Sequence, residues 1–164
     1  MKIVIADAGA LISLGHVGLI GLIEEIFGEL YIAQAVWEEL QNYDNPEFND
    51  NVLNDLKKRV VKIKSRNYLS LVMDYGESES VILYEELFAD YLLIDDNKAR
   101  IVAESLNVKC IGSIGLLIKA KQKGLIVELK PIFEKWISLG RYFSIKLLNK
   151  ILIEIDEEPI RIKN

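Results

Sequence analysis

The sequence predicts an α/β fold with a mainly parallel central sheet. Short apolar runs, each as long as a buried strand, alternate with stretches in which apolar residues recur at helical spacing. Strands joined through helices cross over right-handedly and pair in parallel. The apolar runs at residues 3–5 and 91–94 also lead into acidic residues, Asp7 and Asp95. Since open α/β sheets bind ligands at the carboxyl ends of their strands, these acids are the first candidates for a functional site.

The first half of the chain is expected to alternate three strands with helices. We expect strands at residues 2–7, 30–33 and 60–63, a helix after Gly9, a second at 34–41, and a loop from 42 that passes into a polar helix near 55. The helix after Gly9 should break near Gly15 to Gly18. Gly15, Gly18 and Gly21 are evenly spaced but do not follow a strand as a dinucleotide-binding motif requires, so close helix packing is the predicted role.

Six basic residues flank the strand expected at 60–63. They are Lys57, Lys58, Arg59, Lys62, Lys64 and Arg66. One interpretation is an edge strand protected by solvated lysines, and the other is a line of contacts to phosphate groups.

The second half continues the alternation and ends in helices. We expect a helix beginning at Glu77 and Glu79, a strand at 91–94, a helix from about 97, a strand at 108–111 and a helix from 113 to about 123. Two apolar stripes then predict helices around Trp136 and around Leu152. These helices either cap the sheet or form a homodimer seam or a groove for a partner helix. We therefore expect one domain over 1–164, with a core at 1–128 and a helical extension at 129–164.

Composition limits the chemistry that the chain can perform. It has 164 residues, a formal net charge of −5, one cysteine and one histidine. A single Cys110 excludes an internal disulfide and favours a reducing, cytoplasmic setting, and a single His16 argues against a zinc site or a Ser-His-Asp triad. Any bound metal should have oxygen ligands, which favours Mg²⁺ or Mn²⁺. The negative charge argues against a broad cationic surface.

Residues 3–23 are almost uncharged, yet we do not expect a membrane span. Asp7 within this stretch would cost about 2.5–3.5 kcal/mol near a bilayer centre. A strand followed by a core helix explains the same residues.

Helical geometry narrows the acidic candidates. On a helical wheel Glu39 lies at the edge of the apolar stripe that contains Val36, whereas Glu38 lies opposite and should face water. Glu77 and Glu79 are about 200° apart, so only one is expected to point inward. Acids at a helix N-terminus are also favourable without any metal, so helix capping is the alternative interpretation.

Several motifs, taken in order, are similar to those of one family. They are IADAGALI at 5–12, AVWEEL at 35–40, GESES at 76–80, LLIDDNKAR at 92–100 and IGSIGLLIKAKQKGLI at 111–126. The chain resembles the PIN-domain family of metal-dependent ribonucleases, many of which are the toxin half of toxin-antitoxin pairs. The resemblance implies a three-layer α/β/α sandwich. It implies four catalytic metal ligands: Asp7, Glu39, Glu79 and Asp96. Asp95 is expected beside the ligands, and Glu77 is the alternative to Glu79.

One position departs from the family pattern. The family usually has Ser or Thr two residues after the first Asp, and here that residue is Gly9, which offers no hydroxyl. Ser113 is a candidate to take over a polar role. Lys98 and Arg100 are candidates to bind a substrate phosphate.

The acids and the resemblance together give a functional hypothesis. Three or four close carboxylates cannot all stay ionised without a cation, so a metal is expected. The predicted function is Mg²⁺- or Mn²⁺-dependent endoribonuclease activity, with RNA as substrate, an antitoxin protein as inhibitor and a homodimer as the assembly. The alternative, suggested by Gly9, is a catalytically weak or inactive PIN-like module that binds RNA or protein. A phosphorelay receiver fits less well, because its acid pair follows the first strand.

Overall fold

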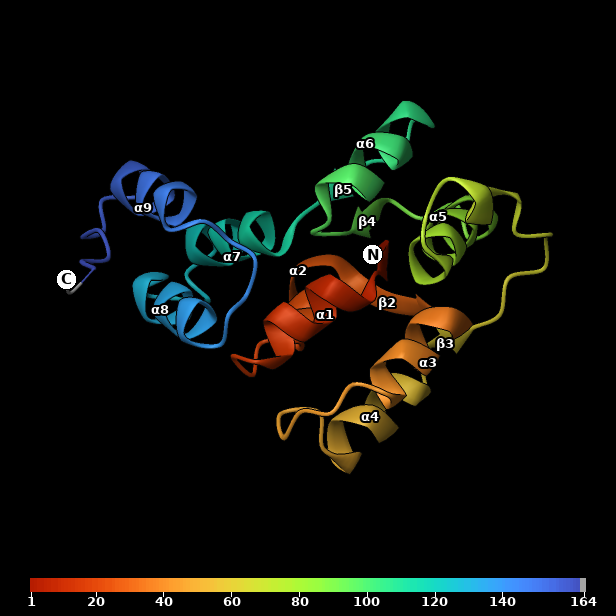
Figure 1. Cartoon of the computed structure of the whole chain (residues 1–164), viewed down its shortest axis with the longest axis horizontal. Coiled ribbons are helices and arrows are strands. Elements are labelled where there is room, and N and C mark those ends of the chain that lie inside the picture. Colours follow the sequence, from red (N-terminus) through yellow and green to blue (C-terminus); the bar gives the residue numbers. More distant parts are fainter. Residues whose placement is uncertain (163–164) are drawn as a thin grey trace. The chain divides into compact units, whose positions relative to one another are not determined.

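The structure, a computed structural model that describes residues 1–162, contains a five-stranded parallel sheet in that part of the chain. The strand order is β3-β2-β1-β4-β5 (Figure 1). The strands are β1 (Lys2–Ala6), β2 (Gly28–Ala33), β3 (Val60–Val61), β4 (Tyr91–Leu93) and β5 (Cys110–Ile111). The predicted α/β class is confirmed, and every described strand pair is parallel.

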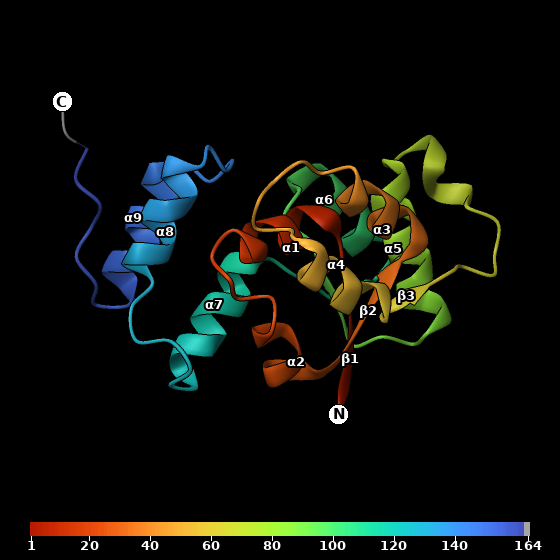
Figure 2. The same cartoon turned by 90° about the horizontal axis from the view of Figure 1, so that it is seen from below.

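Helices connect the strands and follow the last one (Figure 2). They are α1 (Ala8–Gly15), α2 (Leu22–Phe27), α3 (Gln34–Gln41), α4 (Asp50–Lys57), α5 (Tyr75–Glu86), α6 (Asn97–Ser105), α7 (Ser113–Gln122), α8 (Lys130–Ser138) and α9 (Ile145–Glu154), with a short 3-10 helix η1 (Tyr68–Leu71). From β1 the chain moves through β2 to β3, and from β4 it moves the other way to β5. Right-handed crossovers in opposite directions place helices on both faces of the sheet, which gives an α/β/α sandwich.

The chain divides into two compact units, Met1–Ser113 and Ile114–Asn164. The whole sheet belongs to the first unit, while α8 and α9 belong to the second. The predicted division at residue 128 therefore falls inside the second unit, and the organisation as one domain stays a prediction.

The register of the central strands fixes where the acids can meet. Ala6 of β1 pairs with Leu93 of β4, so the two strands end at the same level. The connections from β1 and β4 lead to opposite sides, which makes the junction between these strands the switch point of the sheet. In open α/β sheets the crevice at the carboxyl ends of such strands is where ligands bind.

The core of the first unit lies around these two strands. Val4, Ile5, Leu92 and Leu93 have no exposed surface, as expected for a strand covered on both faces. Trp37 of α3 is 7% exposed and belongs to this core.

Two of the three spaced glycines have clear structural reasons. A Cβ atom on Gly15 would lie 2.5 Å from the ring of Phe48, so only glycine allows this contact. Gly18 has a φ of 68°, which ordinary side chains rarely adopt. The predicted break between α1 and α2 falls here. Gly15 is closely packed, but its neighbour Phe48 lies in the loop before α4 and not in a helix, so the predicted helix packing is not what the glycine serves.

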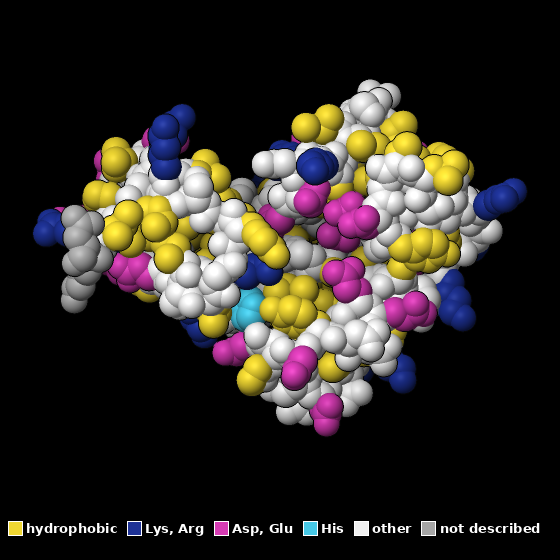
Figure 3. Space-filling view, in the orientation of Figure 1, with side chains coloured by type: hydrophobic (Ala, Val, Ile, Leu, Met, Phe, Trp, Pro, Cys, Tyr) yellow, Lys and Arg dark blue, Asp and Glu magenta, His cyan; other side chains and the backbone are white. Residues whose placement is uncertain are grey.

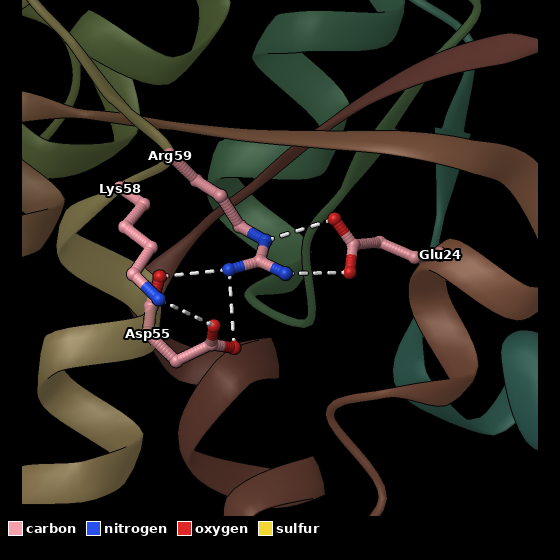
Figure 4. Close-up of polar contacts among 4 residues, drawn as sticks. All are labelled: Glu24, Asp55, Lys58 and Arg59. Carbon is pink, nitrogen blue, oxygen red and sulfur yellow. Dashed lines mark hydrogen bonds and ion pairs between the residues drawn. The ribbon is translucent and has the colours of Figure 1, made fainter.

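Arg59 links three elements of the first unit through a polar network (Figure 4). Its Nε and Nη2 atoms donate to the Glu24 carboxylate of α2 at 2.9 and 2.6 Å. Its Nη1 donates to the carbonyl of Asp55 at 2.7 Å and lies 3.0 Å from the Asp55 carboxylate. Two-pronged pairing of this kind is the strong form of an arginine–carboxylate contact. Arg59 therefore joins α2 and α4 to the start of β3.

A cavity of about 340 Å³ adjoins this network. It is lined by Gly15, Gly18, Ile20, Gly21, Glu24, Leu30, Glu47, Asn49, Val52, Asp55, Leu56 and Arg59. None of the predicted metal ligands lines it, so the cavity and the acids are separate features.

The second unit has its own apolar cluster. Phe133 and Trp136 of α8 stack at 5.7 Å between ring centroids, and Trp136 stacks on Phe143 at 4.6 Å. Leu148 and Leu152 of α9 are fully buried. Across residues 1–162, none of the helices combines the length and the apolar character needed to cross a membrane.

Candidate metal centre

Asp7 stands at the carboxyl end of β1 and begins α1. Its backbone amide donates to the carbonyl of Leu93 at 2.9 Å, which holds it beside β4. Its side chain is buried, with the residue only 6% exposed. The apolar run of β1 therefore delivers a carboxylate into the interior of the switch-point crevice.

Burial makes the Asp7 carboxylate electrostatically costly. Burial is the first cause that raises the pKa of Asp7 from 3.8 to about 7, and the charges of Glu77 and Glu39 raise it further. Backbone amides of Ala8 and Gly9 act in the opposite direction but do not cancel these effects. The Oδ1 atom is buried and has no hydrogen-bond partner. Buried polar atoms are rarely left in this condition, so Oδ1 is the best-placed atom for a cation.

Gly76 shows how closely Glu39 approaches the same point. A Cβ atom built on Gly76 would lie 3.1 Å from Oε2 of Glu39 and 3.9 Å from Oδ1 of Asp7. The absence of a side chain at Gly76 thus leaves room for both oxygens. The neighbouring Glu38 is exposed and accepts a hydrogen bond from Gln34 at 3.0 Å, so the expectation that Glu38 faces water is confirmed.

Glu77 lies among the other acids. It is half-buried in the first turn of α5, where its Oε2 accepts from the backbone amide of Asp74 at 3.4 Å. Burial raises the pKa of Glu77, and so do the charges of Asp96, Asp74 and Glu39. Burial and then the charge of Asp74 raise the pKa of Glu39 as well. These carboxylates are therefore near enough to disfavour one another's ionisation.

Glu79 has a different contact. It is buried, and its Oε2 accepts a hydrogen bond from the backbone amide of Ala35 at 2.9 Å. Ala35 is in the first turn of α3, so Glu79 satisfies an amide that has no partner within its own helix. Glu79 is not among the charges that raise the pKa of Asp7, whereas Glu77 is. Glu77 is therefore near enough to Asp7 to act on its charge, while its carboxylate also completes the capping box of α5 with Asp74.

Asp95 and Asp96 follow β4 but do different things. Asp95 accepts from Ser113 twice, from its amide at Oδ1 and from its hydroxyl at Oδ2, both at 2.7 Å. The Ser113 hydroxyl is thus used within the protein. Asp96 is exposed and begins α6, with its Oδ1 accepting from the amide of Ala99 at 2.8 Å. One Asp96 oxygen has this bond, and the other remains available to a cation.

The two basic candidates lie on α6. Lys98 is exposed. Arg100 forms an ion pair with Glu104 at 2.9 Å. This pair uses only the Nε atom of Arg100, so the rest of its guanidinium group is not committed to Glu104.

The donors fit a hard divalent cation, although they are not assembled as a finished coordination sphere. Among residues 1–162, no three His, Cys, Asp or Glu side chains are grouped closely enough to hold a metal ion as they stand. All donors near Asp7 are carboxylates, which suit Mg²⁺ or Mn²⁺. Glu39 and Asp96 are exposed side chains and have freedom to turn inward.

Two residues of this cluster were not among the predicted site residues. Asp74 begins α5 and raises the pKa of both Glu39 and Glu77, and Gly76 leaves the space between Glu39 and Asp7. Asp74 was detectable, because Asp followed three residues later by Glu is a capping-box pattern. Gly76 was not, since its role depends on a helix distant in sequence.

The glycine at position 9 is not forced by crowding. A Cβ atom there would meet only Oδ2 of Asp7, at 3.9 Å, which is an ordinary contact distance. The site therefore has room for the serine or threonine that this position was expected to hold.

Comparison with known proteins gives one clear match. A family model described as a PIN domain matches residues 3–157. A search of curated proteins finds no match. The family match spans both compact units.

Proposed function

Because this chain belongs to the PIN-domain family, whose fold is of a nuclease type that typically uses divalent metals, we propose that it is an Mg²⁺- or Mn²⁺-dependent endoribonuclease. It hydrolyses phosphodiester bonds of RNA and acts in the cytoplasm. The observation that supports this most directly is Asp7, a buried carboxylate with an unpartnered oxygen that faces two other acids.

Each acid has a proposed role. Asp7, Glu39, Glu77 and Asp96 would hold the metal, with Glu77 taking the place that the family resemblance gave to Glu79. When bound, the metal supplies positive charge for the phosphodiester and lowers the pKa of water. Asp95, fixed by two bonds from Ser113, keeps the turn after β4 in place. Glu79 positions α3, and thereby Glu39, through its bond to Ala35.

RNA cleavage assays test this proposal. We expect the purified chain to cleave single-stranded RNA when Mn²⁺ or Mg²⁺ is present and to stop when EDTA is added. Asp7→Asn should reduce cleavage at least about 100-fold, because it removes a charged metal ligand while keeping the shape of the side chain. Cleavage that continues at the same rate in EDTA would show that the proposed mechanism is wrong.

A pair of variants tests the choice between Glu77 and Glu79. Glu77→Gln should lower cleavage sharply and raise the Mn²⁺ concentration required, with little loss of stability. Glu79→Gln retains an oxygen that can accept from Ala35, so it should retain most of its activity. Both variants change the charge by one unit. The opposite result, activity lost only in Glu79→Gln, would return the metal ligand to Glu79.

Gly9 supports a second candidate function, a PIN-like module that binds RNA or protein without cutting. Position 9 lacks the hydroxyl usual in the family although there is room for one. RNA binding without metal-stimulated cleavage of any tested RNA would favour this module.

We also propose that the chain is a toxin that forms a homodimer and binds an antitoxin protein. In α9, Leu147 and Ile153 are large exposed apolar side chains that a partner could cover, although the charged Lys150 lies between them on the helix surface. Light scattering coupled to size exclusion measures the assembly, and a monomer at micromolar concentration would contradict the homodimer.

A further inference from the structure

The segment of residues 62–75 runs along α5 toward the acidic cluster. Near its beginning, the Glu86 carboxylate accepts from the backbone amides of Lys64 and Ser65, at 2.9 and 2.7 Å. Glu86 is the last residue of α5, whereas Asp74, near the end of the segment, begins that helix. The segment therefore passes from one end of α5 to the other.

Two side-chain contacts fix the middle of the segment. The Tyr68 hydroxyl donates to Glu85 at 3.0 Å. The Asn67 side-chain amide donates to the Ser78 hydroxyl at 2.8 Å. Together with the bonds to Glu86, these contacts hold the segment against both the first and the last turns of α5.

The beginning of the 62–75 segment is cationic. Lys62, Lys64 and Arg66 are all exposed. In the part of the chain that the structure describes, none of the three forms an ion pair, whereas Arg59 is paired with Glu24 and Asp55. Two carboxylates lie beside them, since Glu86 and Glu85 contact the same segment and the charge of Lys64 helps to lower the pKa of Glu86. In a protein of net charge −5, three exposed cations against these two acids leave a small local positive excess, which suits phosphate groups.

The rest of the segment exposes large apolar side chains. Tyr68, Leu71, Val72 and Tyr75 are 53%, 92%, 65% and 62% exposed. Figure 3 shows hydrophobic side chains over the region of α5, beside the acidic side chains on the same face. Exposed apolar groups gathered in this way mark a binding surface.

The cations of the 62–75 segment lie far enough from the candidate metal ligands to attract an anionic chain. Glu77 and Glu86 are nine residues apart on α5, which corresponds to about 14 Å. Charges interact weakly beyond about 8–10 Å at physiological ionic strength. The cations are therefore largely beyond the reach of the acids, which repel a phosphate until a metal is bound.

We propose that the 62–75 segment binds single-stranded RNA and leads it to the acidic cluster. Lys62, Lys64 and Arg66 contact the phosphates, and the exposed tyrosines stack on bases. Unpaired bases are required, because a duplex would offer these rings only its backbone. This inference rests on the proposed function, since it names the form of RNA that the same site would receive.

Binding assays that need no cleavage test the cationic part. A short fluorescent oligouridine is titrated with the Asp7→Asn chain, and anisotropy is recorded over a series of salt concentrations. Replacing Lys62, Lys64 and Arg66 by alanine should weaken binding at least about tenfold and reduce the slope of log affinity against log salt by about 2. The matched control replaces Lys123, Lys146 and Lys150, exposed lysines of the second unit, and removes the same charge.

Tyr75→Ala tests the apolar part. We expect it to weaken binding about tenfold without changing the salt slope, since stacking releases no counterions. An equally long RNA duplex should bind less tightly to the parent chain. Circular dichroism checks that each variant is folded, and these exposed side chains leave the core unchanged.

Several outcomes would overturn the inference. Equal weakening in the control triple variant would show that only net charge matters, and equal affinity for duplex RNA would exclude stacking. A Tyr75→Ala variant that alters the oligomeric state but not RNA affinity would assign the surface to a protein partner. If the binding results are as expected but no metal restores cleavage to the parent chain, the nuclease proposal fails while the RNA surface stands.

Discussion

At the scale of single residues, Asp7 is both the strongest candidate ligand and a cost to the metal-free protein. Its pKa of about 7 lies above its ordinary value of 3.8. The folded state therefore favours the protonated form of Asp7. The stability that this protonated carboxyl group contributes is fully present below pH ~3.8, the ordinary pKa, and is lost as pH rises through about 7. Without metal, the free energy of unfolding should fall over this range.

The variant Asp7→Asn measures this cost. Asparagine stays neutral, so in EDTA above pH ~8 it should raise the free energy of unfolding by at most roughly 4 kcal/mol, at about 1.4 kcal/mol per pKa unit. Below pH ~4 the two proteins should differ little, because Asp7 is then protonated. Urea unfolding at both pH values provides the measurement. An equal difference at both would show that ionisation of Asp7 is not the cause.

Individual residues also show what the sequence alone could predict of the site. Asp7 and Asp96 were identifiable because acids after apolar strands lie at the carboxyl edge of the sheet. The choice between Glu77 and Glu79 could not be predicted, because their separation of about 200° on the helix does not tell which groups each side chain contacts. The Ala35 amide, which donates a hydrogen bond to Glu79, belongs to α3, and several elements separate α3 from α5 in the sequence.

At the scale of helices and strands, the local sequence pattern predicted the type and order of the elements better than the residues at which they begin and end. The helix expected at 34–41 is observed with those bounds, whereas the strand expected at 108–111 is ordered as a strand only at Cys110–Ile111. Strand length depends on the neighbouring strand, and β4, its partner, is only three residues long. The 3-10 helix η1 was not predicted, because contacts with α5 rather than its own sequence hold that segment in place.

The start of α8 illustrates an element stabilised from a distance. Glu157 accepts from the backbone amides of Leu129 and Lys130, each at 2.8 Å, and forms an ion pair with Lys121 at 2.8 Å. Burial acts to raise the pKa of Glu157, but the bond from Lys121 and the two amides together lower it.

We expect Glu157→Gln to lower the free energy of unfolding by about 1.5–3 kcal/mol at neutral pH, since it replaces charge-assisted bonds with neutral ones. A lowered pKa in the folded state means that this stabilisation is present above about 4.5, the ordinary value, and is lost as pH falls through the folded pKa. The difference from the parent chain should therefore vanish in acid. Urea unfolding followed by circular dichroism gives the comparison, and Glu158→Gln, an exposed neighbour, is the control. A difference that persists in acid would assign the loss to packing.

At the scale of the whole molecule, charge is distributed unevenly around a negative total. The candidate metal ligand Glu77 lies at one end of α5, and the cations of the 62–75 segment lie at the other end, beside Glu85 and Glu86. A divalent cation relieves the repulsion between the acids, so binding should be coupled to folding.

Thermal unfolding measures this coupling. At a Mn²⁺ concentration 100 times its dissociation constant the gain is about 2.7 kcal/mol, or roughly 5–10 °C in Tm for a chain of this size. NaCl at matched ionic strength should give little of this shift, and Asp7→Asn should lose most of it. An equal shift in Asp7→Asn would show that the ion acts elsewhere.

The hydrogen bond between Glu79 and Ala35 has a consequence for how the proposed nuclease would lose activity on heating. It is a buried polar contact between the two helices that carry Glu39 and Glu77, so together with the packing around Gly76 it helps to set the gap between those acids. Mild heating or a nearby core substitution that loosens this contact would spoil the spacing while the sheet persists, and inactivation would then precede melting.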